Sequence, residues 1–275
     1  MSPVQIAEGF SLTNRWLLYT SFMLSPAQFL SGLGSDCPSN LGFLAYNWYS
    51  QIVWYQAIKA KQMHALSLMT PYFNLIYAIS FLGGITSGNI VFGGLLCLGT
   101  AGVLLLNTVS AWTSWATNQP EGIGEYQFFF FGWQTLSTGW HSFFLLWQIF
   151  DTINALFFLS VGIGVAVLQK PIKEKVEKDF DGLYLVRWLY VPFGGAVMLF
   201  FFWPFIMWTE LTASRNHIES HTDFIAVGLF GAQVVALFIP SLSGYLGCFK
   251  GIFPCLGPRK VSADLETGVE LPEGG

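Results

Sequence analysis

Residues 128–168 read FFFFGWQTLSTGWHSFFLLWQIFDTINALFFLSVGIGVAVL, and the way this stretch folds decides the architecture expected of the chain. Its 41 residues include one charged side chain, Asp151. A membrane-spanning helix needs about 20 mostly apolar residues, whereas a single helix of this length would extend about 60 Å. We therefore interpret the stretch as two spans, 128–148 and 152–168, joined by a tight turn at 151–154.

The composition of the whole chain is typical of a membrane protein. Of its 275 residues, 53% are hydrophobic and 10% are charged, whereas a soluble domain carries about 25% charged residues. No long basic stretch is present, so no nucleic-acid partner is expected. We predict an all-α fold, a polytopic transmembrane helix bundle of about eight spans whose main partner is the lipid bilayer. The predicted spans are 16–34, 41–58, 65–83, 89–111, 128–148, 152–168, 187–210 and 224–244.

The basic residues orient this eight-span arrangement. Cytoplasmic loops carry an excess of Lys and Arg, and of the 12 basic residues all except Arg215 fall on one side. Both termini are then expected in the cytoplasm. In a seven-span alternative, 128–168 crosses once and three basic residues change sides, so the charge rule favours eight spans. The basic residues on the predicted cytoplasmic side are Arg15, Lys59, Lys61, Lys170, Lys173, Lys175, Lys178, Arg187, Lys250, Arg259 and Lys260.

The chain is expected to divide just beyond its last predicted span. Residues 1–248 would form a single transmembrane helical domain. Residues 249–275 would form a flexible cytoplasmic tail, because they are rich in Pro, Gly and acidic residues. The longest charged connector is predicted at 169–182. Cys248 and Cys255 flank a basic residue beside the membrane, which is typical of palmitoylation sites, but the sequence does not decide whether either is lipidated.

The candidate ligand-binding residues recur every seven positions in the predicted span 128–148. Seven residues are close to two helical turns, so each set would occupy one helix face, and the two faces adjoin. Polar groups within a membrane usually face the bundle interior or a water-filled cavity. The pattern therefore predicts an intramembrane cavity, with hydrogen bonding between packed helices as the alternative. The two sets are Trp133, Trp140 and Trp147, and Gln134, His141 and Gln148.

Further polar residues lie in other predicted spans and are candidates to join the lining of such a cavity. Taken alone, each is better explained by a structural hydrogen bond between helices. These residues are Asn47, Gln51, Asn74, Asn107 and Gln233.

Titratable residues on the predicted non-cytoplasmic side suggest a different chemistry. Asp151 and Glu210 are candidate catalytic residues, because a carboxyl group removed from water can act as a general acid. Nearby Trp faces would stabilise a cation that forms beside them. His217 and His221 are candidate metal ligands, since two histidines four apart on a helix share a face and suit zinc. The alternative for this pair is two solvated loop side chains.

Three classes of function follow from these patterns. The leading prediction is a bundle that binds or translocates a small solute or ion through a Trp/Gln/His-lined cavity. The first alternative is an integral membrane enzyme that acts on a lipophilic isoprenoid or lipid substrate. The second is an accessory subunit of a membrane complex, and glycines in several spans are compatible with an oligomer. No cofactor is predicted, apart from zinc at the histidine pair.

Overall fold

The computed structural model describes residues 4–6, 9–24, 39–62, 64–70, 73, 90–179 and 187–237. The chain divides into two compact units, Met1–Leu242 and Ser243–Gly275, and all described residues belong to the first. Most of them are helical, which confirms the all-α prediction. The predicted tail 249–275, with Cys248 just before it and Cys255 within it, lies outside the described residues.

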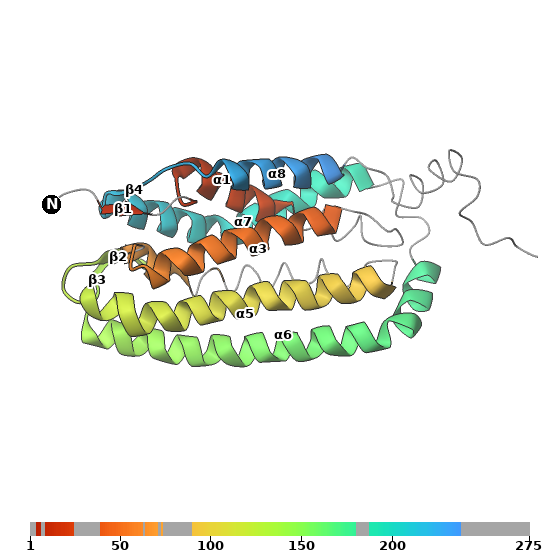
Figure 1. Cartoon of the computed structure of the whole chain (residues 1–275), viewed down its shortest axis with the longest axis horizontal. Helices are drawn as coiled ribbons and strands as arrows, with labels where there is room; N and C mark the ends of the chain where they lie inside the picture. Colours follow the sequence, from red (N-terminus) through yellow and green to blue (C-terminus); the bar gives the residue numbers. More distant parts are fainter. Residues whose placement is uncertain are drawn as a thin grey trace, which may run out of the picture. The chain divides into compact units, whose positions relative to one another are not determined.

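Six α-helices, one 3-10 helix and four short strands make up the described part of the chain (Figure 1). The helices are α1 (Leu12–Met23), α3 (Ser39–Lys59), η1 (a 3-10 helix, His64–Met69), α5 (Ile90–Glu121), α6 (Thr138–Asp179), α7 (Arg187–Arg215) and α8 (Phe224–Leu237). The strands are β1 (Val4–Ile6), β2 (Gln127–Phe129), β3 (Trp133–Thr135) and β4 (Ile218–Ser220).

The helices pack around an aromatic core. Helices α5 and α6 lie side by side and antiparallel, and the β2–β3 hairpin joins them (Figure 1). Helix α3 packs against both α5 and α8, while α1 packs against α7 and α8. The residues that face inward are both apolar and polar. The bulkiest fully buried aromatic side chains in this core are Tyr19, Phe22, Tyr46, Phe128 and Phe144.

Helix α6 is continuous through the predicted turn at 151–154, so the division of this stretch into two spans is wrong. Residues 140–161 contain neither Pro nor Gly, the two residues that most disfavour a helix. Asp151 is buried, and the Thr152 hydroxyl accepts a hydrogen bond from Trp112 of α5 at 2.8 Å. The polar residues of the expected turn therefore pack within the bundle. The predicted connector 169–182 is helical as far as Asp179.

The first part of the same stretch is a β-hairpin and not a helix. Strands β2 and β3 pair antiparallel, with Phe128 opposite Gln134. Phe131 and Gly132 in the loop both have positive φ, 53° and 157°, and a glycine at a hairpin loop supports such a turn. Helix α6 consequently begins only at Thr138.

These corrections remove one crossing from the predicted arrangement. Strand β1 pairs in parallel with β4, with Gln5 opposite Glu219, so the amino terminus and the α7–α8 connection lie at the same end. The eight-span arrangement places them on opposite sides of a membrane, and in this respect it is wrong. Asn216 donates to the Gln127 carbonyl at 2.6 Å, which brings the hairpin to the same place. We call this end of the bundle the amino-terminal end.

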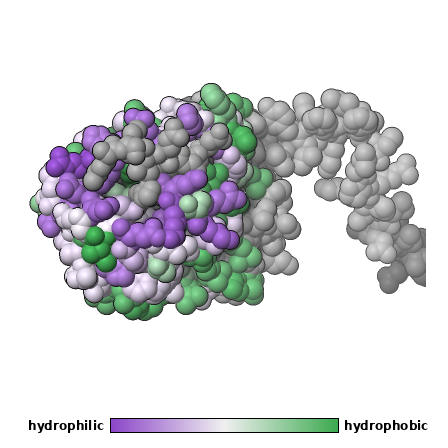
Figure 2. Space-filling view, turned by 60° about the vertical axis from the view of Figure 1, so that its left-hand side comes forward, coloured by the Kyte–Doolittle hydropathy of each residue, from purple (hydrophilic) through white to green (hydrophobic). Residues whose placement is uncertain are grey.

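Two helices in the described ranges are long and apolar enough to cross a membrane, Thr138–Gly164 within α6 and Phe193–Arg215 within α7. In the most apolar 18-residue segment of each helix, only 22% and 39% of the residues are buried. A core helix of a soluble protein is mostly buried. Figure 2 looks toward the amino-terminal end, where hydrophilic residues gather, while hydrophobic residues lie along the flanks. An exposed apolar surface of this extent marks contact with lipid or with another protein.

The other predicted spans are not confirmed as membrane-spanning. Phe224–Ala236 is an apolar helix but a shorter one. Parts of 16–34 and 65–83, including Asn74, lie outside the described residues.

If α6 crosses a membrane once, the amino terminus, Gln62 and Glu219 should face the same side, and Lys175 the other. A chain that lacks its native cysteines, with single cysteines at 62, 175 or 219 and an amino-terminal tag, allows the test. A membrane-impermeant maleimide added to intact cells should label 62 and 219 alike and leave 175 unlabelled until the membrane is opened. Labelling of 62 and 219 from opposite sides would restore the eight-span arrangement.

Candidate functional site

The six residues of the predicted seven-residue pattern do not line one face of a helix. Trp133 and Gln134 belong to strand β3, so only four of the six lie on α6. Trp133 is 46% exposed and stacks under the Arg215 guanidinium, 5.4 Å from the ring centre. Trp140 and Trp147 pack into aromatic clusters, with Phe128 and Phe143 respectively. None of the six lines the cavity described below.

His141 and Gln148 join α6 to α5. The imidazole of His141 stacks on Trp115 with ring centres 4.7 Å apart, and its Nε2 lies 3.1 Å from the Trp115 carbonyl oxygen. The Trp115 indole donates in return to the His141 carbonyl at 3.1 Å. Gln148 donates to the Ala111 carbonyl at 2.8 Å. These contacts match the alternative given for the pattern, hydrogen bonding between packed helices.

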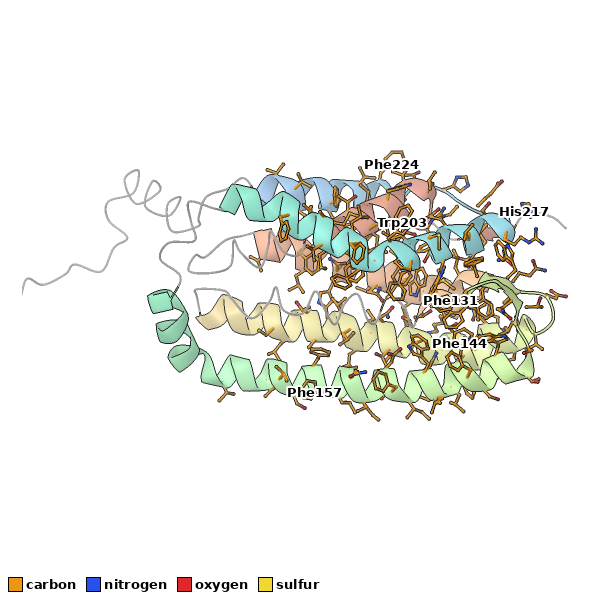
Figure 3. The ribbon with its side chains drawn as sticks, turned by 180° about the vertical axis from the view of Figure 1, so that it is seen from behind. Phe131, Phe144, Phe157, Trp203, His217 and Phe224 are labelled. Atoms are coloured by element: carbon orange, nitrogen blue, oxygen red, sulfur yellow. The ribbon has the colours of Figure 1, made fainter. Side chains whose placement is uncertain are left out.

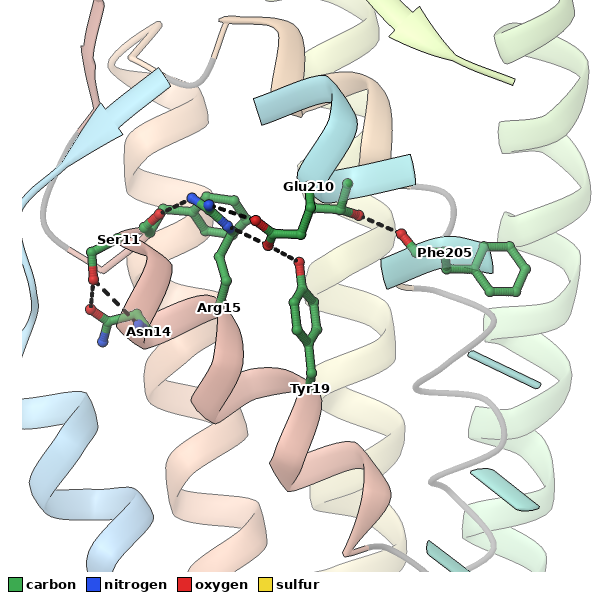
Figure 4. Close-up of polar contacts among 8 residues, drawn as sticks. Ser11, Asn14, Arg15, Tyr19, Phe205 and Glu210 are labelled. Atoms are coloured by element: carbon green, nitrogen blue, oxygen red, sulfur yellow. Dashed lines mark hydrogen bonds and ion pairs between the residues drawn. The ribbon is translucent and has the colours of Figure 1, made fainter. Parts of the chain in front are cut away.

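Glu210, a candidate catalytic acid, is held in an ion pair. Its two carboxylate oxygens accept hydrogen bonds from Nε and an Nη of Arg15, at 2.7 and 2.9 Å (Figure 4). The Tyr19 hydroxyl donates to the same carboxylate at 2.9 Å. A two-point arginine–carboxylate pair is strong and directional. We therefore assign Glu210 to fastening α7 to α1, and the fold gives no support to its predicted catalytic role.

Asp223 is a buried carboxylate that the sequence did not single out. It caps α8, because one oxygen accepts hydrogen bonds from the backbone N–H groups of Ile225 and Ala226 at 2.8 and 3.3 Å. Its other oxygen accepts from the Tyr49 hydroxyl at 2.6 Å. Asn14 of α1 completes the group, since its side-chain oxygen accepts from the Asp223 backbone N–H at 2.9 Å. Helices α1, α3 and α8 thus meet at one residue, Asp223, through its backbone and its carboxylate.

A cavity of about 20 Å³ lies among these three helices. Such a volume holds about one water molecule. Its walls include Asn14, Gln51 and Trp54, and residues Gly9 and Phe10 of the amino-terminal segment also line it. Trp54 is 4% exposed, and its indole N–H has no hydrogen-bond partner among the described residues. A buried donor beside a space of this size suits a bound water or a solute of similar size.

A second group of polar residues lies deeper between the same helices. Gln233 of α8 accepts from the Ser21 hydroxyl at 3.2 Å, and Asn47 of α3 donates to that hydroxyl at 3.3 Å. All three side chains are buried. The side-chain oxygen of Asn47 and the side-chain nitrogen of Gln233 have no partner among the described residues. Gln233 follows Asp223 by ten residues, so the two levels are about 15 Å apart along α8.

Together these residues form a polar column between α1, α3 and α8. Along α3 the order from the amino-terminal end is Trp54, Gln51, Tyr49 and Asn47, so the cavity and the buried carboxylate lie toward that end and the Asn47 level lies nearer the middle of the helices. Its members are Asn14, Gln51 and Trp54 at the cavity, Tyr49 and Asp223 at the buried carboxylate, and Ser21, Asn47 and Gln233 at the deepest level. An interior position for Asn47, Gln51 and Gln233 agrees with their assignment in the sequence as candidates for a polar lining.

The remaining candidates lie apart from the column. Asp151 is buried in the interior of α6, which packs against α5. His217 and His221 are exposed and flank strand β4, so they do not share the helix face that the zinc prediction required. In a strand, four residues extend about 13 Å, too far for two ligands of one ion. Within the described ranges, no group of three His, Cys, Asp or Glu side chains is placed to hold a metal.

Tyr126, in the connection before β2, has a raised pKa. Burial, together with the nearby carboxylates of Glu121 and Glu125, raises the pKa of Tyr126 to about 12. An unfolded chain would ionise this hydroxyl near pH 10. The bundle therefore loses stability from this group as the pH rises from about 10 to 12, and none below that window.

Some residues of the column were not recognisable as such in the sequence. Asp223 precedes an apolar run, which is a helix-start signal, but Ser21 and Tyr49 resemble many other residues in the predicted spans. Comparisons with protein-family models, with curated proteins and with solved structures find no match. The geometry of the bundle is therefore the basis for assigning a function.

Replacing Arg15 by Met should destabilise the bundle strongly, because it leaves the Glu210 carboxylate unpaired at a helix contact. Breaking a buried ion pair costs about 3–5 kcal/mol, and we expect the lower end because Glu210 is 28% exposed. Thermal unfolding of the purified protein measures the loss. Lys61→Met is the matched control: Lys61 pairs with Glu121, but both side chains are about half exposed, so the loss should stay below about 1 kcal/mol.

The double variant Arg15→Met, Glu210→Met should regain much of the lost stability, since two apolar side chains leave no buried charge. Equal losses in Arg15→Met and Lys61→Met would mean that the Arg15–Glu210 pair has no special role in the bundle.

Proposed function

We propose that this chain is a seven-span membrane protein whose polar column binds and passes a small, neutral, hydrogen-bonding solute, with water as its simplest occupant. The observation that carries the proposal is the set of buried polar atoms in the column that have no partner among the described residues. The Trp54 indole nitrogen lies beside the cavity, and the unpaired amide atoms of Asn47 and Gln233 lie deeper, between helices of a bundle with apolar flanks.

The membrane arrangement rests on helix apolarity and on charge. With α6 as a single crossing, Arg15, Lys59, Lys61 and Arg215 lie toward the amino-terminal end. Of the other eight, four lie in the carboxyl-terminal part of α6, Arg187 begins α7, and three belong to the predicted tail. The excess of Lys and Arg then places the carboxyl terminus in the cytoplasm and the amino terminus outside.

The unpaired atoms indicate the chemistry of the solute. The Trp54 indole and the Gln233 amide nitrogen are donors, whereas the Asn47 amide oxygen is an acceptor. A bare cation would match only acceptors, and an anion only donors. A mixture of both kinds matches a neutral molecule that donates and accepts hydrogen bonds. The size of the cavity restricts the occupant at that level to about the size of water.

Replacing Gln233 by Leu should block the column at its deepest level. Proteoliposomes that contain the wild-type chain should shrink faster than protein-free liposomes in an osmotic gradient, followed by stopped-flow light scattering. Gln233→Leu should lower that added permeability at least about tenfold, because an isobutyl group cannot replace the hydrogen bonds of an amide. Asn47→Leu should behave in the same way.

Gln148→Leu is the matched control. Gln148 and Gln233 are 1% and 0% exposed, and each has one unpaired amide atom among the described residues. Gln148 lies in the α5–α6 contact and not in the column, so its replacement should leave permeability nearly unchanged. If Gln233→Leu and Gln148→Leu are both as permeable as wild type, the column is not the path. Gradients of urea and glycerol, run in parallel, distinguish water from larger neutral solutes.

An accessory subunit of a membrane complex is the second candidate. It is favoured by the packed state of His141 and Gln148, whose hydrogen bonds join α5 and α6 instead of lining a cavity. Wild-type proteoliposomes with no added permeability to water, urea or glycerol would favour this function. The membrane-enzyme alternative is weakened because Glu210 is committed to Arg15.

A further inference from the structure

Phe131, in the loop of the β2–β3 hairpin, combines a strained backbone with an exposed ring. Its φ is 53°, in the left-handed region that a bulky residue rarely adopts. Its side chain is also 84% exposed. A glycine follows directly at 132, so exchanging the two residues would give the loop a glycine in the strained position. An exposed phenylalanine with such a strained backbone is expected to contact a partner, because a favourable contact of the ring would offset the strain.

The hairpin loop lies along the flank of the bundle. The Phe131 ring contacts that of Trp208 on α7, with centres 5.3 Å apart. The neighbouring Phe130 ring contacts both Trp208 on α7 and Trp140 on α6, at 5.3 and 5.6 Å. Trp208 is seven residues from the end of α7, which places it about 10 Å from that end. Figure 3 shows Phe131, in the hairpin loop, between the two helices and set back from the end of the bundle where His217 lies.

Arg215 contacts the hairpin both beside its loop, at Trp133, and at its base, at Gln127. The Arg215 guanidinium lies over the Trp133 ring, 5.4 Å from its centre, and its Nε donates to Gln127 of β2 at 2.8 Å. Arg215 is the last residue of α7. An arginine and a tryptophan at the end of an apolar helix are typical of the headgroup level of a membrane. Arginine also pairs readily with phosphate.

We infer that the hairpin loop 130–132 anchors the bundle in the outer leaflet of a phospholipid bilayer. Phe131 lies among the acyl chains, in the space between α6 and α7, while Trp133 and Arg215 lie at the headgroups, with the guanidinium facing phosphate. The inference rests on the proposed membrane arrangement, because it takes the ends of α6 and α7 as the outer surface.

The depth and the charge of the surroundings identify lipid as the partner. A phenylalanine that projected from the end of the bundle into water would gain nothing from its strained backbone. This ring instead contacts Trp208, about two helical turns inside the end of α7, and the exposed apolar residues Phe200 and Trp203 lie further from that end on the same helix. A positive side chain lies toward the helix end and none is among these rings. Apolar surface below a cationic rim matches a phospholipid leaflet.

A fluorescent reporter at position 131 tests the inference. In a chain that lacks its native cysteines, the variants Phe131→Cys, Phe200→Cys and Glu219→Cys are each labelled with the dye NBD and reconstituted into phosphatidylcholine vesicles. Lipids with bromine at a defined acyl position then quench dyes in the hydrocarbon. Phe200, on α7 and 78% exposed, is the lipid-facing reference, and the exposed Glu219 of β4 is the aqueous one.

Quenching at 131 that approaches the quenching at 200, with none at 219, is the expected result. Quenching at 200 but not at 131 would overturn the anchor and leave the membrane arrangement intact. Absence of quenching at both 131 and 200 would contradict the membrane arrangement itself, and the anchor with it. A dye at 131 that is shielded from water but is not quenched by the brominated lipids would contradict a lipid partner and indicate a protein.

Phe131→Gly tests the same point without a dye. Glycine relieves the backbone strain but removes the contact with Trp208, so the midpoint of thermal unfolding in phospholipid nanodiscs should stay near or above that of wild type if the ring has no partner beyond Trp208. A lipid-anchored ring predicts the opposite, a lower midpoint, with Phe131→Trp close to wild type. An unchanged or higher midpoint in Phe131→Gly would contradict the anchor.

Discussion

The amino-terminal end of the bundle depends on the ion pair between Arg15 and Glu210. The pair joins α1 to α7 across 195 residues of sequence. The same guanidinium donates to the Phe10 carbonyl at 2.9 Å and thereby fixes the segment that lines the cavity. Its neighbour Asn14 is then placed to bind the backbone of Asp223, where α8 begins. Removing one partner of a buried ion pair is costly, and the contacts of Arg15 and its neighbour Asn14 tie the amino-terminal segment, α7 and α8 to α1.

The buried polar groups of the bundle fall into two kinds with different consequences. At the α5–α6 contact, His141 and Trp115 form two reciprocal hydrogen bonds and a ring stack, which leaves little for a ligand to bind. In the column, Ser21 joins Asn47 to Gln233, yet each of the two amides keeps one buried unpaired atom. Unpaired buried groups are unfavourable. The column is therefore the part of the described interior where a bound solute would form the most favourable new hydrogen bonds.

The sequence predicted the helical class and the burial of polar residues, but not the contacts of those residues. Asn47 and Gln233 lie in apolar runs, and a polar side chain there must face protein, so their interior position was predictable. The links through Ser21 and Arg15 were not, because each joins residues about 200 positions apart and depends on how helices pack. The seven-residue spacing of Trp133, Trp140 and Trp147 wrongly predicted that all three lie on one helix. Such a spacing does not show where the helix begins.

The Phe-rich stretch at 128–131 is the source of the largest error in the predicted arrangement, the extra membrane span. It also shows how that error arises. Hydropathy reports that side chains avoid water, and it carries no information on the direction of the chain. A hairpin that folds back along α6 and α7 and a helix that crosses the bilayer both bring phenylalanines to hydrocarbon, so both give the same apolar run. Only Gly132 distinguished them, as a turn residue inside the run. Once the first ten residues turn back in this way, α6 needs only one crossing, and the amino terminus lies at the same end as the α7–α8 connection.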